Sequence, residues 1–270
     1  MGKNSHIQWT DDTWNPWHGC RKVSDGCKFC YMYRDKERYG QDPTKVIRSK
    51  TNFNAPLKWK EPRKVFTCSW SDFFIEEADG WRAEAWDIIR KTPHLTYQIL
   101  TKRPERILEC LPPDWGKGWD NVWLGVSVEN QEVAERRISK LLFVPAKTRF
   151  ISVEPILGPI TIYGLLAYGQ WDLNQDVKHT QKIHWVIIGG ESGNETGDYR
   201  YRPAMVDWII ELKNQCYSAW VPCFIKQLGS RIAKELKLKD RFGGDMDEFP
   251  DALRVRMFPA AVGERMVKQV

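Results

Sequence analysis

Three cysteines in one short stretch constrain this chain more than any other feature of its sequence. Residues 18–31 read His-Gly-Cys-Arg-Lys-Val-Ser-Asp-Gly-Cys-Lys-Phe-Cys-Tyr, and Cys20, Cys27 and Cys30 fall within eleven positions. A glycine precedes each of the first two, and glycine adopts tight or left-handed backbone conformations at little cost. The segment therefore predicts a loop that encloses a small bound group. Clustered thiolates are the ligands that a soft metal or an iron–sulfur cluster requires.

Three thiolates leave two kinds of centre open. A closed structural zinc site needs four protein ligands, and His18 could complete a Cys3His set. An iron–sulfur cubane held by three cysteines leaves one iron free to bind another molecule. A group of cysteines that binds nothing is the third reading. A disulfide framework is disfavoured, because the cysteine count of seven is odd and the N-terminus shows no secretory leader.

The bulk composition indicates a globular protein of one large or two small domains. The 270 residues are 42% hydrophobic and 28% charged, which is an ordinary balance. No apolar run approaches the roughly 18–20 residues that a membrane span needs. Residues 1–6 lack an apolar targeting core. We therefore expect a cytoplasmic protein with no membrane partner.

Positive charge is concentrated in the first part of the chain. The net charge is +6, and residues 1–60 alone hold twelve Lys and Arg against six Asp and Glu. Several of these cations flank the cysteines, among them Arg21, Lys22, Lys28 and Arg34. A basic rim around a reactive site suits a polyanion such as DNA or RNA. A solvated helix face is the alternative explanation.

Strand-like and helix-like segments alternate along most of the chain. We expect strands at residues 6–10, 64–69, 95–100, 121–128, 148–153, 184–188 and 221–225. We expect helices at residues 31–39, 81–90, 133–142 and 205–216, and one that opens at Pro104. Residues 160–182 predict a long loop. This alternation favours an α/β fold with a parallel sheet, which we interpret as a partial (β/α)6–7 TIM-like barrel over residues 1–228. Residues 229–270 then form a short, loose, polar C-terminal extension.

Polar residues follow most of the expected strands. They are Ser69, Ser71, Asp72, Thr101, Lys102, Arg103, Ser127, Glu129, Glu154, Glu191, Ser192, Lys226 and Gln227. In α/β barrels the carboxyl ends of the strands carry the active site, and the cysteine loop follows the first expected strand. The pattern therefore predicts an enzyme. Any single member could instead be a helix cap or a surface ion pair. The remaining cysteines, Cys68, Cys110, Cys216 and Cys223, are interpreted as structural.

Several motifs resemble those of the phage-associated three-cysteine-motif proteins, which are radical-SAM-like. Besides the cysteine loop, they are residues 7–10 (Ile-Gln-Trp-Thr), 15–16, 100–104 (Leu-Thr-Lys-Arg-Pro), 124–129 (Leu-Gly-Val-Ser-Val-Glu), 152–159 (Ser-Val-Glu-Pro-Ile-Leu-Gly-Pro), 189–193 and 224–227. Residues 68–72 depart from the expected pattern. The first cysteine gap of six is also longer than the three that is usual in the wider radical SAM group.

This resemblance implies a barrel of the radical SAM type with a [4Fe–4S] cluster on Cys20, Cys27 and Cys30. The open iron would chelate S-adenosylmethionine, and an electron donor, flavodoxin-like or chemical, would drive its cleavage to a 5′-deoxyadenosyl radical. The resemblance also implies the contacts to this cofactor. Phe29 would lie near the adenine or the cluster, and Ser71 and Asp72 would meet the methionine amino group. The ribose or carboxylate would contact Ser127, Glu129 and Glu154, and the adenine edge would contact Gly189, Gly190, Glu191 and Ser192.

The resemblance and the basic N-terminal part together suggest the substrate. Some members of this group are associated with phages that decorate their DNA bases. We therefore expect isomerisation or a related rearrangement of a modified thymine in DNA, with Lys102, Arg103 and Lys226 meeting phosphate or a carboxylate. Two alternatives stay open. One is a non-catalytic zinc (Cys3His) module that binds nucleic acid, and the other is a radical enzyme that acts on a small molecule or peptide.

Overall fold

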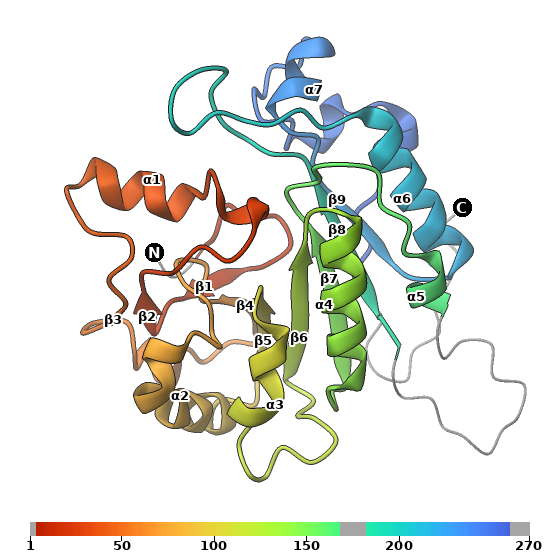
Figure 1. The fold of residues 1–270 in the computed structure, drawn as a ribbon. Helices are drawn as coiled ribbons and strands as arrows, with labels where there is room; N and C mark the ends of the chain where they lie inside the picture. Colours follow the sequence, from red (N-terminus) through yellow and green to blue (C-terminus); the bar gives the residue numbers. More distant parts are fainter. Residues whose placement is uncertain (1–3, 168–181, 260–270) are drawn as a thin grey trace, which may run out of the picture.

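Short runs rich in Val, Ile and Phe form one parallel sheet, as their β-branched and aromatic composition predicts. The computed structural model describes residues 4–167 and 182–259. Its strands are β1 (Asp12–Trp14), β4 (Arg63–Thr67), β5 (Leu95–Thr101), β6 (Val122–Val128), β7 (Thr148–Val153), β8 (Trp185–Gly189) and β9 (Cys223–Gln227). They lie side by side in chain order, and the sheet curls into a half-barrel (Figure 1). The predicted α/β class and partial barrel are confirmed at this level.

Helices lie between most successive strands, and one more follows the last strand. They are α1 (Tyr31–Arg38), α2 (Asp79–Lys91), α3 (Ile107–Cys110), α4 (Gln131–Phe143), α5 (Tyr163–Ala167), α6 (Val206–Ser218) and α7 (Ser230–Glu235). Short 3-10 turns are η1 (Asp25–Cys27), η2 (Ala55–Lys58), η3 (Glu76–Ala78), η4 (Pro104–Arg106), η5 (Met246–Glu248) and η6 (Asp251–Leu253). A two-stranded ribbon, β2 (Trp17–His18) with β3 (Ile47–Arg48), stands beside the sheet. No helix in the described ranges is long and apolar enough to cross a membrane.

The two faces of the sheet bury different side chains. Side chains alternate between faces along a strand, and those facing the helices, such as Ile99, Val126 and Ile188, belong to the larger core cluster. The inner face carries an aromatic cluster instead, made of Trp9, Phe66, Phe150, Trp185, Ile187 and Phe224. Aromatic rings bury large areas, so this cluster fills the amino-terminal half of the half-barrel.

The same inner rows become polar toward the carboxyl ends of the strands. After Phe150 on β7 the next inward positions are Ser152 and Glu154, and after Phe224 on β9 the next inward position is Lys226. Because all the strands are parallel, these polar positions gather at one edge of the half-barrel. That edge, opposite the aromatic cluster, is where the expected site residues meet.

The first expected strand is wrong. Residues 6–10 do not pair with the sheet, and Thr10 instead closes a turn on Ile7. Trp9 leaves this turn to fill the inner aromatic cluster, and the strand comes later, at Asp12–Trp14, paired with Val65–Thr67. Asp12 is fully buried beside Arg63, so the first strand begins with a buried, paired carboxylate.

Two further expectations need revision. Residues 160–182 contain helix α5, while the part from 168 to 181 lies outside the described residues. The segment after Gly229 is less loose than expected, because it contains α7 and buries Phe249 and Leu253 in the core. Arg256 forms an isolated β-bridge with Phe224 on β9, and Phe258 contacts the ring of Phe224, so this segment packs against the last strand.

Candidate functional site

The cysteine loop lies at the carboxyl edge of the sheet, between β2 and α1. Cys27 ends the turn η1 and Cys30 is the N-cap of α1, so secondary structure fixes two of the three cysteines. All three are partly buried. The Ser71 hydroxyl, which follows β4, donates to the carbonyl of Gly19 at 2.6 Å. The loop is thus joined to the sheet, and three charged bridges extend this attachment.

The first bridge starts at Asp72 after β4. Its carboxylate accepts from the Thr101 hydroxyl at 2.7 Å and from the backbone N–H of Lys102 at 2.9 Å. The Arg103 guanidinium lies 3.2 Å from the same carboxylate and donates to the carbonyl of Arg21 at 2.9 Å. Asp72 and Arg103 are both buried. Asp72 therefore organises the edge between β4 and β5 and holds Arg103 against the cysteine loop.

The second bridge joins the end of β6 to the middle of the loop. Glu129 and Arg137 form an ion pair of 3.0 Å with side chains 0% and 2% exposed. Arg137 also donates to the Ser24 hydroxyl at 3.0 Å, and Glu129 accepts from the N–H of Gly26 at 3.2 Å. A Cβ at Gly26 would lie 3.0 Å from the Glu129 carboxyl carbon, so glycine permits this close approach.

The third bridge comes from the loop after β8. Glu191 binds Arg202 through both carboxylate oxygens, at 2.9 Å from Nε and 2.7 Å from Nη2. Arg202 donates in turn to the carbonyl of Asp25 at 2.9 Å, and its guanidinium lies 5.1 Å from the centre of the Phe29 ring. A bidentate pair of this kind is geometrically specific. Arg202 therefore contacts both the backbone of the cysteine loop and the ring of Phe29 on that loop.

The inner face adds a fourth ion pair, which is more open. Lys226 on β9 donates to Glu154 after β7 at 2.6 Å, and both side chains are 20% exposed. A Cβ at Gly189 would lie 3.1 Å from the Glu154 carboxyl carbon, so glycine at the end of β8 leaves room for this carboxylate. The buried Ser127 hydroxyl donates to the carbonyl of Glu154 at 3.2 Å. This pair is the part of the edge best placed to meet a bound molecule.

The other expected residues have different surroundings. Gly190 and Gln227 exchange two hydrogen bonds, of 3.0 and 2.8 Å. Ser192 is exposed. The Lys102 side chain is partly buried, and within residues 4–167 and 182–259 its ammonium has no ion-pair partner. The structure thus brings together the cysteine loop, Asp72, Arg103, Glu129 and Glu191, and leaves Lys102 and Ser192 at the rim.

Electrostatics around the thiols reflect burial. Burial, with the nearby Asp72 carboxylate, raises the pKa of the free Cys20 thiol to about 12. Burial and all three cysteines raise the pKa of Tyr33 to about 12, so the sulfurs share the surroundings of this ring, whose hydroxyl donates to the carbonyl of Cys20 at 2.6 Å. A thiolate in this setting requires a positive partner or a bound metal.

The cysteine loop offers three partly buried thiols and the nearby His18 as possible metal ligands. In the part of the chain that the structure describes, no three His, Cys, Asp or Glu side chains lie close enough to hold one ion. Zinc needs its ligand atoms within about 2.0–2.3 Å. His18 keeps one relevant feature, because its buried Nδ1 has no hydrogen-bond partner among the described residues. Burial, with the positive charge of Lys36, lowers the pKa of His18, so this imidazole is neutral at pH 7.

Residues 4–261 match the profile of a family described as "Protein of unknown function (DUF5131)". The chain belongs to this DUF5131 family. No curated protein and no solved structure matches it.

Two arginines that bind the cysteine loop of this DUF5131 protein were not expected from its sequence. Arg137 and Arg202 hold the cysteine loop through Glu129 and Glu191. Arg137 lies on α4, where an arginine on an amphipathic helix normally indicates a solvated face. Arg202 follows a loop with no regular pattern. Nothing in the local sequence indicates which carboxylate either arginine binds.

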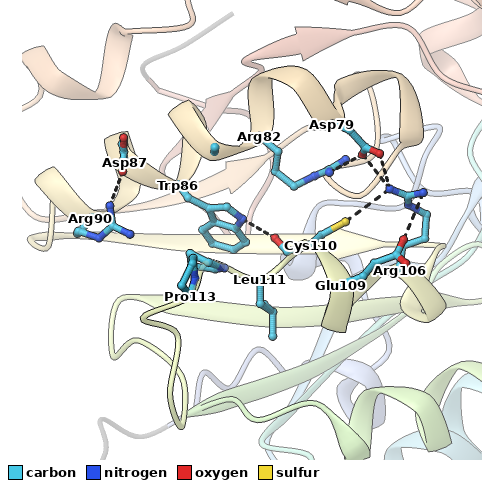
Figure 2. A pocket seen from close by; sticks show the side chains of 12 residues that line it. Asp79, Arg82, Trp86, Asp87, Arg90, Arg106, Glu109, Cys110, Leu111 and Pro113 are labelled. Atoms are coloured by element: carbon cyan, nitrogen blue, oxygen red, sulfur yellow. Dashed lines mark hydrogen bonds and ion pairs between the residues drawn. The ribbon is translucent and has the colours of Figure 1, made fainter.

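The outer layer of the DUF5131 protein contains a separate pocket of about 690 Å³ between α2 and α3. Figure 2 shows that its arginines point to carboxylates of the same pocket. Arg106 lies 2.8 Å from Asp79, and Arg90 also pairs with Asp87. The Trp86 indole donates to the carbonyl of Cys110 at 2.8 Å. These internal pairs satisfy the charges, and no expected site residue lines the pocket.

Proposed function

We propose that this protein is a radical S-adenosylmethionine enzyme with a [4Fe–4S] cluster on Cys20, Cys27 and Cys30. The observation that supports this most directly is the attachment of the cysteine loop. Charged pairs from the ends of β4, β6 and β8, two of them buried and the third partly exposed, hold it against the polar edge of a half-barrel. A loop fixed by three charged pairs is pre-organised for ligation, and the two buried pairs are costly to bury unless fully bonded.

The donor set fits a cluster that is larger than one ion. Three thiols on one loop leave one iron of a cubane without a protein ligand. When bound, the cluster and S-adenosylmethionine would supply reductive cleavage of the cofactor and abstraction of a substrate hydrogen. The protein's own part is to place these groups and to exclude water. A flavodoxin-like protein or a chemical reductant is the expected electron donor.

The contacts described above refine the roles that the resemblance implies. Ser71 and Asp72 are engaged in holding the loop and the β5 edge, so they position the site rather than bind the cofactor. Glu129 and Glu191 are likewise bound to arginines. Glu154 and Lys226 stay partly exposed on the inner face. We assign Glu154 to the ribose or ammonium of the cofactor and Lys226 to an anionic group, with Phe29 packing beside the adenine.

The proposed substrate is a modified thymine in DNA, and the proposed reaction is an isomerisation or related rearrangement. Exposed cations surround the cysteine loop, including Arg21, Lys22 and Lys28. A positive rim attracts a polyanion. Lys102, whose ammonium has no ion-pair partner in the described ranges, is the rim cation best placed to meet a phosphate.

Anaerobic purification with iron, sulfide and zinc analysis tests the proposal. About four irons per chain and a broad absorption band near 400 nm, as expected for a thiolate-held cubane, would support it. Cys27→Ala should abolish both the cluster and cofactor cleavage. Cys110→Ala is the matched control, because this cysteine lies in the outer pocket and its loss should leave iron unchanged. Full iron in Cys27→Ala would contradict the ligand assignment.

One observation favours a second candidate. The Nδ1 of His18, which has no hydrogen-bond partner in the described part of the chain, is available to a metal, as a Cys3His zinc module that binds nucleic acid would require. That module predicts a colourless protein with one zinc and no iron in oxygen-free material. A radical enzyme for a small molecule or peptide predicts instead cofactor cleavage without DNA affinity. Metal analysis of this preparation therefore separates the zinc module from the two radical enzymes, and a DNA-binding assay on the same preparation separates these two.

A further inference from the structure

Arg103 is in direct contact with one of the candidate cluster ligands. Its Nη1 lies 3.9 Å from the Cys20 sulfur, within hydrogen-bonding range for sulfur, and 3.2 Å from the Asp72 carboxylate. Its Nη2 donates to the carbonyl of Arg21 at 2.9 Å. The residue is only 7% exposed. A guanidinium placed in this way is held rigidly beside the sulfur and away from solvent, so it is poorly placed to bind a substrate phosphate.

We propose that Arg103 is a positioning residue that raises the reduction potential of a cluster bound at Cys20. The inference rests on the proposed function. The potential of an iron–sulfur cluster depends on its net charge, on hydrogen bonds to its sulfurs and on solvent exposure. Arg103 supplies a full positive charge and an N–H donor to one ligand sulfur. Both favour uptake of the electron that the reductant delivers.

Asp72 provides a second test, because its negative charge should shift the reduction potential in the opposite direction to Arg103. Its buried carboxylate contacts the same Nη1 atom that lies near the Cys20 sulfur, and in this low-polarity setting its charge is screened weakly. When Arg103 is replaced by Met, the negative charge of Asp72 stays near Cys20 without its partner. When Asp72 is replaced by Asn, Arg103 stays and the negative charge is removed. The first change should lower the potential, and the second should raise it.

Arg106 provides a matched control on the same short turn. Like Arg103, it lies close to a sulfur, with Nη2 3.6 Å from Cys110, and to a carboxylate, Asp79, at 2.8 Å. Figure 2 shows this arginine pointing into the outer pocket. Arg106→Met therefore removes the same kind of cation beside a sulfur that is not a proposed ligand, and it should leave the cluster potential unchanged.

The experiment is a spectroscopic redox titration of the reconstituted full chain under anaerobic conditions. For Arg103→Met we expect the equilibrium constant of one-electron reduction to fall at least tenfold, which is about 59 mV. We expect a shift in the opposite direction for Asp72→Asn and a smaller fall for Arg103→Lys, which keeps the charge. A merely structural role would not give shifts of opposite sign.

Each outcome of this titration decides something different. A wild-type protein without a cluster overturns the proposed function together with this inference. A wild-type cluster whose potential is the same in both Arg103→Met and Asp72→Asn overturns the inference alone. If Arg103→Met takes up no iron, Asp72→Asn decides, because a potential that stays constant or falls in that variant contradicts the proposal. An equal shift in Arg106→Met also contradicts it.

Discussion

Arg137 on α4 and Glu129 at the end of β6 form an ion pair that is closed to solvent. Each of the two residues also makes a hydrogen bond to the cysteine loop. Their charged atoms lie 3.0 Å apart. Arg137 continues to the Ser24 hydroxyl, and Glu129 continues to the N–H of Gly26. A single buried pair therefore couples the stability of the sheet to the geometry of the loop.

Removing one partner of this pair should be costly. Arg137→Met leaves the Glu129 carboxylate buried and unpaired, and breaking a buried pair in this way typically costs about 3–5 kcal/mol. We expect a loss of unfolding free energy in that range in urea titrations, together with faster amide exchange of residues 24–27. Arg136→Met is the control, because Arg136 is the exposed neighbour on the same helix. Equal effects of the two substitutions would contradict the assignment.

Gly26 should not tolerate a side chain. A Cβ there would stand 3.0–3.2 Å from the Glu129 carboxylate atoms, which Arg137 prevents from moving aside. We expect Gly26→Ala to reduce the unfolding free energy by about 1–3 kcal/mol, the usual cost of overpacking. Gly80→Ala on α2 meets nothing within 4 Å and should instead stabilise by roughly 0.5 kcal/mol, because alanine favours helix. Thermal unfolding of both variants tests the contrast.

The parts of the fold that the sequence predicted best are those buried on both faces. Residues 148–153 form β7 at the expected bounds, because a strand that contacts helices on one side and the barrel interior on the other is continuously apolar. The cysteine loop was also identified, since its signal is local spacing. The first strand was missed because Asp12 is buried through a partner, Arg63, that lies 51 residues later.

The roles of site residues were harder to predict than their positions. Asp72 and Arg103 were expected at the strand ends, and the structure places them there. Nothing local indicates that they bond to each other and to the cysteine loop. Arg137 and Arg202 were missed altogether, because their carboxylate partners are chosen by tertiary packing. Sequence patterns report which side chains face a site, but the pairing of charges depends on the folded arrangement.

Stability should fall in acid through His184. Burial, with the positive charges of Lys182 and Arg149, lowers the pKa of His184 from 6.5 to about 4. Its Nδ1 accepts from the backbone N–H of Arg149 at 3.0 Å, which requires an unprotonated nitrogen. Between pH 6.5 and about 4 the unfolded chain therefore binds the additional proton, and the folded state loses up to about 3 kcal/mol, at 1.36 kcal/mol per pKa unit.

The measurement is the urea midpoint as a function of pH in the wild type and in His184→Asn. Asparagine keeps an acceptor for the Arg149 N–H but does not titrate. Its stability should therefore depend less steeply on pH between 4 and 6.5. Parallel curves for the two proteins would show that His184 does not contribute.

DNA affinity should depend on salt if phosphates are contacted at the basic rim. For duplex DNA the slope of log K against log salt is about −0.9 per phosphate neutralised. Lys28 is exposed on the cysteine loop, so Lys28→Gln should reduce the slope by roughly 0.9 and weaken binding at low salt. Lys140, exposed in the last turn of α4, lies toward the opposite edge of the sheet, and Lys140→Gln should change neither quantity. Affinity that does not vary with salt in the wild type would argue against a DNA substrate, and equal losses in both variants would indicate binding by overall charge rather than at the cysteine loop.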